Sequence, residues 1–79
     1  MKLKALRRVG RTQGLIKEGE VVEGTWEDIY KRLDSAFING CELERIKGTN
    51  NFKVFAGYGS HVSDVEITGT DEEIKKVFG

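Results

Sequence analysis

Three arginines near the start of the chain are the residues whose type and spacing most plainly suggest a chemical role. Arg7, Arg8 and Arg11 belong to a stretch, residues 1–17, that contains several basic side chains and no acidic one. A guanidinium group binds phosphate through paired hydrogen bonds, so this stretch could recognise a nucleotide or the backbone of a nucleic acid. The same bases could instead neutralise acidic strands beside them and discourage aggregation at a sheet edge. The sequence leaves both interpretations open.

A glycine-rich turn later in the chain is a second candidate. It runs from Gly57 to His61 and has the sequence GYGSH. Backbone amides in such a turn could bind an anion or a partner beside Tyr58, and His61 could change its charge near neutral pH. The turn lacks the longer spacing and the following helix of a phosphate-binding loop. The alternative is a hairpin turn that happens to contain the one histidine of the chain.

A nucleophilic site would need Cys41 and His61, the single cysteine and the single histidine. Cys41 follows a predicted helix, where the negative end of the helix dipole disfavours a reactive thiolate. One cysteine also excludes an internal disulfide, and one cysteine with one histidine does not fill a zinc site. We therefore expect no catalytic, metal-binding or cofactor-binding residue, and no enzyme activity.

Two pairs of acids stand at alternate positions of predicted strands, Glu42 with Glu44 and Asp64 with Glu66. Alternate residues of a strand share one face, so each pair is expected to point outward together. Paired carboxylates on an exposed strand are usually solvated surface. They could instead form an acidic docking surface that imitates phosphate charge toward a nucleic-acid-binding partner.

The clearest structural pattern begins at Trp26. Apolar residues recur from there at helical spacing, and charged residues occupy the opposite face. Thr25 can cap the first turn, Asp28 completes a capping box, and Asn39-Gly40 suits the end of a helix. The pattern predicts one central amphipathic helix over about 26–38.

Shorter patterns before and after this helix predict the remaining elements. A phase break after Leu43 predicts a bulge near Glu44-Arg45. A second capping box, Thr70 to Glu73, opens a short C-terminal helix over about 71–78. The alternating segments predict strands over about 2–9, 20–23, 41–47, 52–58 and 63–68.

Composition and element order together define the fold class. The 79 residues are enough for one domain, 1–79, and 38% hydrophobic with 33% charged residues is too apolar for disorder and too charged for a membrane protein. We expect a two-layer α+β fold, in which an antiparallel sheet of four to five strands packs one face against the central helix.

Three segments give the chain a resemblance to a known group of proteins. The opening MKLKALRRVG, the turn LIKEGEVVEG and the ending VEITGTDEEIKKVF resemble the short orphan proteins that phages and prophages of low-GC bacteria encode. The resemblance covers about half of the chain. It implies an accessory protein that acts by binding, for example on a host enzyme or a defence system, and it assigns a role to no residue.

These observations give two expectations of function. The first is a small non-enzymatic binding or inhibitor protein with a host or phage protein as its partner. The second is a phosphate-recognising nucleotide or nucleic-acid binder that uses the basic N-terminal segment. No apolar run is long enough for a signal peptide or membrane span, so we expect a cytoplasmic protein without a membrane partner. Exposed strand edges, with Trp26 or Phe55 as the anchor of a two-fold contact, could also support a homo-oligomer.

Overall fold

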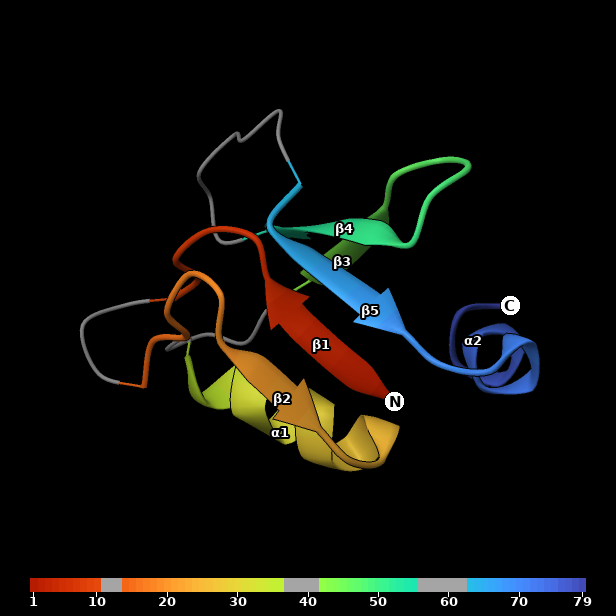
Figure 1. Ribbon diagram of the computed structural model, residues 1–79, viewed down its shortest axis with the longest axis horizontal. Helices are drawn as coiled ribbons and strands as arrows, with labels where there is room; N and C mark the ends of the chain where they lie inside the picture. The colour runs from red at the N-terminus through yellow and green to blue at the C-terminus, as the bar shows by residue number, and fades with distance from the viewer. Residues whose placement is uncertain (11–13, 37–41, 56–62) are drawn as a thin grey trace.

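The protein folds into one five-stranded antiparallel sheet with two helices, as a computed structural model shows (Figure 1). The structure describes residues 1–10, 14–36, 42–55 and 63–79. The predicted α+β class is confirmed. The elements in chain order are β1 (Lys2–Ala5), β2 (Val21–Glu23), α1 (Trp26–Ser35), β3 (Glu42–Arg45), β4 (Asn51–Phe55), β5 (Val65–Thr68) and α2 (Asp71–Phe78).

The strands lie in the order β2-β1-β5-β4-β3, and each neighbouring pair is antiparallel. The first two strands form a hairpin, the last three form a meander, and β5 pairs with β1 to join the two parts. Strands β2 and β3 are therefore the edges of the sheet. The chain passes from one edge to the other through α1, which lies behind β2 in the view of Figure 1.

Strict alternation divides the sheet into an apolar and a polar face. Along β1, Leu3 and Ala5 are buried while Lys2 and Lys4 are exposed. The register places apolar residues of neighbouring strands side by side, with Leu3 opposite Ile67. The apolar face and α1 enclose a single core cluster of buried residues, Leu3, Ala5, Val9, Ile16, Ile29, Leu33, Ala36, Phe52, Val54, Val65 and Ile67.

The first helix begins as its sequence predicts. Thr25 accepts a hydrogen bond from the Asp28 amide, and the Asp28 carboxylate accepts one from the Thr25 amide in return. Ile29 and Leu33 are completely buried, so this helix supplies the second layer of the core. The helix ends at Ser35 with Ala36 as its C-cap, which is shorter than predicted, and the predicted stop signal Asn39-Gly40 lies outside the described residues.

The second helix has the predicted bounds and is less deeply buried than α1. Its capping box joins Thr70 and Glu73 as expected, yet none of its residues is fully buried. Phe78 fastens it to the domain: its ring lies 4.6 Å from that of Phe52 and 5.1 Å from that of Trp26, measured between centroids. The aromatic contacts of Phe78 and the packing of partly buried Ile74 against the core therefore hold α2 in place.

The chain leaves the sheet earlier than predicted after β1. This strand ends at Ala5, and Val9 then pairs with Ile16 as an isolated antiparallel bridge. Both residues are buried, so the loop between β1 and β2 contributes to the core instead of extending the strand. The predicted strand over residues 2–9 was wrong in length because alternation of apolar residues does not distinguish a strand from a loop that also packs inward.

Glycines and one arginine attach this loop to the last turn of α1. A Cβ built on Gly10 would lie 2.7 Å from Ala36, and one on Gly14 would lie 2.6 Å from the Ser35 carbonyl oxygen. The Arg32 guanidinium donates to the carbonyl oxygens of Gly14 and Leu15. These contacts fix the position of the loop against the end of the helix.

The predicted bulge near Glu44-Arg45 is absent. Residues from Glu42 to Arg45 pair one to one with Phe55 to Phe52, and the Ile46 amide continues the ladder by donating to the Asn51 carbonyl at 2.9 Å. Ile46 is half-buried without a change of register, which removes the need for an extra residue in the strand.

Within the described part of the chain, neither helix has the length and apolar character needed to cross a membrane.

Candidate functional site

Arg7 makes an ion pair inside the protein. Its Nε lies 3.5 Å from Oδ1 of Asp64, a residue with only 7% of its surface exposed. The other carboxylate oxygen of Asp64 accepts the Val54 amide at 2.7 Å, and its backbone bonds to Leu6 and Phe52. Asp64 therefore ties the end of β1 to β4, and Arg7 compensates the buried charge.

The burial of Asp64 corrects the prediction that it points outward with Glu66. Asp64 precedes β5 and turns inward, whereas Glu66 lies on the polar face opposite Lys4. The two acids thus form no common surface. Sequence alternation suggested otherwise because it takes no account of the Val54 amide that needs an acceptor.

The remaining predicted site residues divide into one that is described and three that are not. Arg8 is exposed, and among described residues its side chain has no hydrogen bond or ion pair. Arg11, Tyr58 and His61 lie outside the described residues, as does Cys41. The structure therefore tests neither the glycine-rich turn nor a Cys-His pair.

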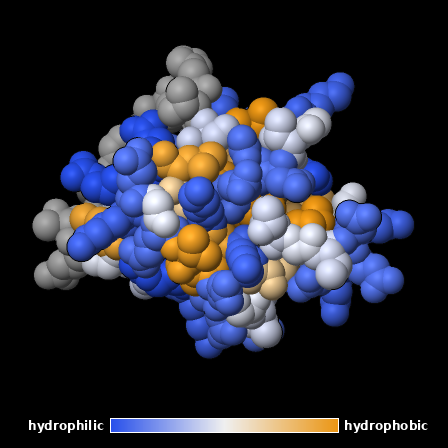
Figure 2. Space-filling model, viewed as in Figure 1, coloured by the Kyte–Doolittle hydropathy of each residue, from blue (hydrophilic) through white to orange (hydrophobic). Residues whose placement is uncertain are grey.

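The polar face of the sheet carries charges of both signs in fixed register. Lys4 stands opposite Glu66, and Glu44 stands opposite Lys53. Near the end of the sheet, the Lys2 ammonium lies 3.2 Å from the Glu23 carboxylate. We call the set Lys4, Glu44, Asn51, Lys53 and Glu66 the charged sheet face. Figure 2 shows the molecule in the view of Figure 1, with mainly hydrophilic residues and separate apolar patches on the surface.

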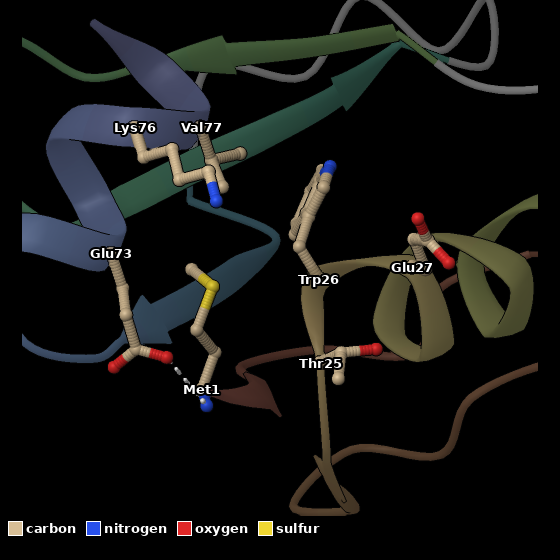
Figure 3. A pocket seen from close by; sticks show the side chains of 7 residues that line it. All are labelled: Met1, Thr25, Trp26, Glu27, Glu73, Lys76 and Val77. Carbon is tan, nitrogen blue, oxygen red and sulfur yellow. Dashed lines mark hydrogen bonds and ion pairs between the residues drawn. The ribbon is translucent and has the colours of Figure 1, made fainter.

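A second surface feature is an open cleft of about 630 Å³ between the two helices. Figure 3 shows Trp26 standing between the start of α1 and the side chains of α2, with Met1 beside it. The α1 wall and the α2 wall each combine apolar and charged groups. The residues that line the cleft are Met1, Thr25, Trp26, Glu27, Glu73, Lys76 and Val77.

The charges of the cleft differ in how they are satisfied. Glu73 accepts the Thr70 amide at 2.9 Å, and its other oxygen lies 3.5 Å from the Met1 ammonium. Hydrogen bonds from the Thr70 backbone and hydroxyl, followed by the positive Met1 nitrogen, lower the pKa of Glu73 below its ordinary value. Glu27 and Lys76, by contrast, have no ion pair or side-chain hydrogen bond with any described residue.

The described residues offer binding groups rather than a reactive constellation. The cleft presents an indole ring, a thioether and an aliphatic side chain, flanked by Glu27 and Lys76, which have no ion pair with a described residue. Across residues 1–10, 14–36, 42–55 and 63–79, no three His, Cys, Asp or Glu side chains gather as metal ligands would. Such a set of groups can bury an apolar side chain and form ion pairs at its margin.

Sequence reasoning identified Trp26 but not the cleft. Lys76 and Val77 reach Trp26 only because α2 folds back beside α1, far along the chain. The sequence did show an aromatic residue at the first position of a helix, where few residues of the same helix can cover it. This position indicates that Trp26 lies at the edge of the core, but it does not indicate which residues of another element contact it.

No protein-family model, curated protein or solved structure matches this chain. The described residues form a small α+β domain with a charged sheet face and an aromatic cleft between its two helices.

Proposed function

We propose that this chain is a small non-enzymatic binding protein that engages a host protein through the charged sheet face. The observation that carries the proposal is that both helices pack on the apolar side of the sheet, where Ile29, Leu33 and Phe78 meet the core. No described helix covers the opposite face. Five hydrogen-bonded strands thus present a fixed pattern of acids and bases to a partner.

The pattern of this face favours a protein partner over a nucleic acid. Lys4 and Lys53 each stand directly opposite an acid, so the face has no continuous positive stripe. Alternating charges of fixed register give specificity, because a partner with the wrong pattern places like charges together. Val21, 49% exposed beside Lys4, adds apolar area at the margin of the face.

The resemblance to phage and prophage proteins supports a more specific role for this binding protein. On that basis the chain is an inhibitor or accessory protein encoded by a phage or mobile element. It acts in the cytoplasm, where it occupies a host enzyme or a defence protein. A single cysteine, which precludes an internal disulfide, agrees with a reducing compartment.

A capture experiment tests this proposal. The immobilised protein is incubated with a lysate of a low-GC bacterium, and retained proteins are identified by mass spectrometry. A double variant, Glu44→Lys with Lys53→Glu, keeps the cross-strand attraction but reverses its direction, so it should fold as the parent does and lose the captured protein. Lys31→Glu, on the exposed side of α1, serves as the control and should retain it. Capture that is equal for the parent and the double variant would remove the sheet face as the binding surface.

Arg8 supports a second candidate function, that of a phosphate-recognising nucleotide or nucleic-acid binder. Its guanidinium is exposed and has no partner among the described residues, whereas Arg7 is engaged by Asp64. Binding of a labelled oligonucleotide and of a cyclic nucleotide is measured over a series of salt concentrations. Binding at low salt that falls steeply with added salt and weakens in Arg8→Ala supports this function. No binding at any salt concentration eliminates it.

A further inference from the structure

We propose that a second copy of this chain packs against the cleft between α1 and α2, forming a two-fold dimer in which Glu27 of each copy faces Lys76 of the other. The cleft is separate from the charged sheet face, so the dimer does not depend on the proposed function.

The apolar side chains at and beside the cleft are only partly buried in the single chain. Ile74, Val77 and Phe78 form the apolar side of α2, and all three are only partly buried. Trp26 is also partly buried, and Tyr30 beside it, with ring centroids 5.8 Å apart, is 40% exposed. A surface of partly buried aromatic and aliphatic groups at the junction of two helices has the composition of a protein interface core.

The positions of Glu27 and Lys76 in the cleft favour a second copy of this chain as the partner. Glu27 belongs to the α1 wall and Lys76 to the α2 wall, and Figure 3 shows them on opposite sides of Trp26. A two-fold axis along the cleft exchanges the walls, so the α1 wall of one copy meets the α2 wall of the other. Each Glu27 then meets a Lys76, which gives two equal ion pairs from two side chains that have no described partner in the single chain.

The whole chain is also suited to pairing with itself. It has thirteen basic and thirteen acidic residues and hence a formal net charge of zero, so two copies approach without overall repulsion. A domain of this size has a small core, and burial of the α2 stripe on association adds stability that the single chain lacks.

Trp26 is the only tryptophan and gives a direct signal from the cleft. We expect its fluorescence emission to shift to shorter wavelength as the protein concentration rises over roughly a hundredfold range, because pairing removes its ring from water. Sedimentation velocity over the same range should show conversion of monomer to dimer. A monomer at every concentration, with unchanged emission, would overturn the proposal.

Charge reversal tests the two-fold geometry. Glu27→Lys or Lys76→Glu alone puts like charges opposite each other at both ends of the interface, and either variant should weaken the dimer about tenfold. The double variant, Glu27→Lys with Lys76→Glu, restores opposite charges and should recover most of the parent affinity. A dimer unaffected by the single reversals, or one that the double variant fails to restore, would contradict the pairing of Glu27 with Lys76.

Matched controls come from the same helical positions outside the cleft. Glu72→Lys reverses an acid in the first turn of α2, as Glu27→Lys does in α1, and Lys75→Glu reverses a base in the last turn beside Lys76. Both controls change the helix dipole interaction equally but do not line the cleft. They should therefore dimerise as the parent does, and circular dichroism of all variants checks that each remains folded.

Discussion

The two helices of this protein have nearly the same local design and very different places in the fold. Each begins with a threonine cap and a complete capping box, carries acids in its first turn and bases in its last, and has one apolar side. Yet α1 buries Ile29 and Leu33 completely, while α2 buries no residue completely. The comparison shows that local signals specify where a helix forms but not how deeply it is packed.

The difference in burial arises from the elements that pack against each helix. The apolar side of α1 lies over the sheet, and Arg32 and two glycines fasten its last turn to the loop that precedes β2. The helix α2 follows β5 and contacts the edge of the core through Phe78. One helix is thus part of the folding unit, and the other is an attachment to it.

The largest expected effect separates the two helices directly. Leu33→Ala removes a completely buried side chain from α1 and should lower the free energy of unfolding by about 2–5 kcal/mol. Ile74→Ala, at a half-buried position of α2, should leave the free energy of global unfolding almost unchanged, because α2 is an attachment to the folding unit. Urea denaturation followed by circular dichroism measures both. Equal losses would mean that α2 is as deeply involved in the core as α1.

The attachment of α1 to its loop gives the next effect. Gly14 has a φ of +76° and no room for a Cβ, so Gly14→Ala should destabilise the protein by about 2–3 kcal/mol. Gly19→Ala is the matched control: its φ is +86° but nothing lies within 4 Å, so it should cost about 1 kcal/mol. Thermal or urea unfolding of the two variants measures the difference. Equal losses would show that the close approach to Ser35 contributes nothing beyond the backbone conformation.

Removal of the N-cap hydroxyls should affect the two helices differently. Thr25→Ala and Thr70→Ala each remove an N-cap hydroxyl, worth about 1 kcal/mol of helix stability. Because α1 unfolds with the core, the first variant should lower global stability by that amount. The second should mainly speed amide hydrogen exchange within α2 and leave the urea midpoint almost unchanged. Loss of global stability in Thr70→Ala would show that α2 unfolds together with the sheet.

The smallest effect is the dependence of α2 on pH. The pKa of Glu73 is lowered in the folded protein by its hydrogen bonds with Thr70, so the ionised form contributes stability above its ordinary pKa of 4.5. That contribution is lost as the pH falls through the lower, folded-state pKa. Titration of the Glu73 carboxyl by NMR should give a pKa below 4.5, and Thr70→Val should raise it. A value unchanged by Thr70→Val would show that the Thr70 hydroxyl does not contribute to the lowered pKa.

The candidate site could be predicted only in part. Trp26 was visible as an aromatic residue that starts a helix, but Lys76 and Glu27 could not be assigned to opposite walls without knowing where α2 returns. The three arginines were visible as a basic cluster. Nothing in their spacing revealed that Arg7 is paired with a buried acid from the other end of the chain.

Local sequence patterns were sufficient to predict the class of fold, the starts of both helices and the alternation of apolar and polar residues in β1, β4 and β5. These features depend on neighbours within a few residues, such as the reciprocal hydrogen bonds of Thr25 with Asp28 or the alternation of Leu3 with Lys4. Only the tertiary structure decided that Asp64 turns inward, that Arg32 binds the loop at Gly14 and that α2 stays half-buried. Those outcomes depend on which distant backbone groups and side chains arrive beside a residue, and no local pattern contains that information.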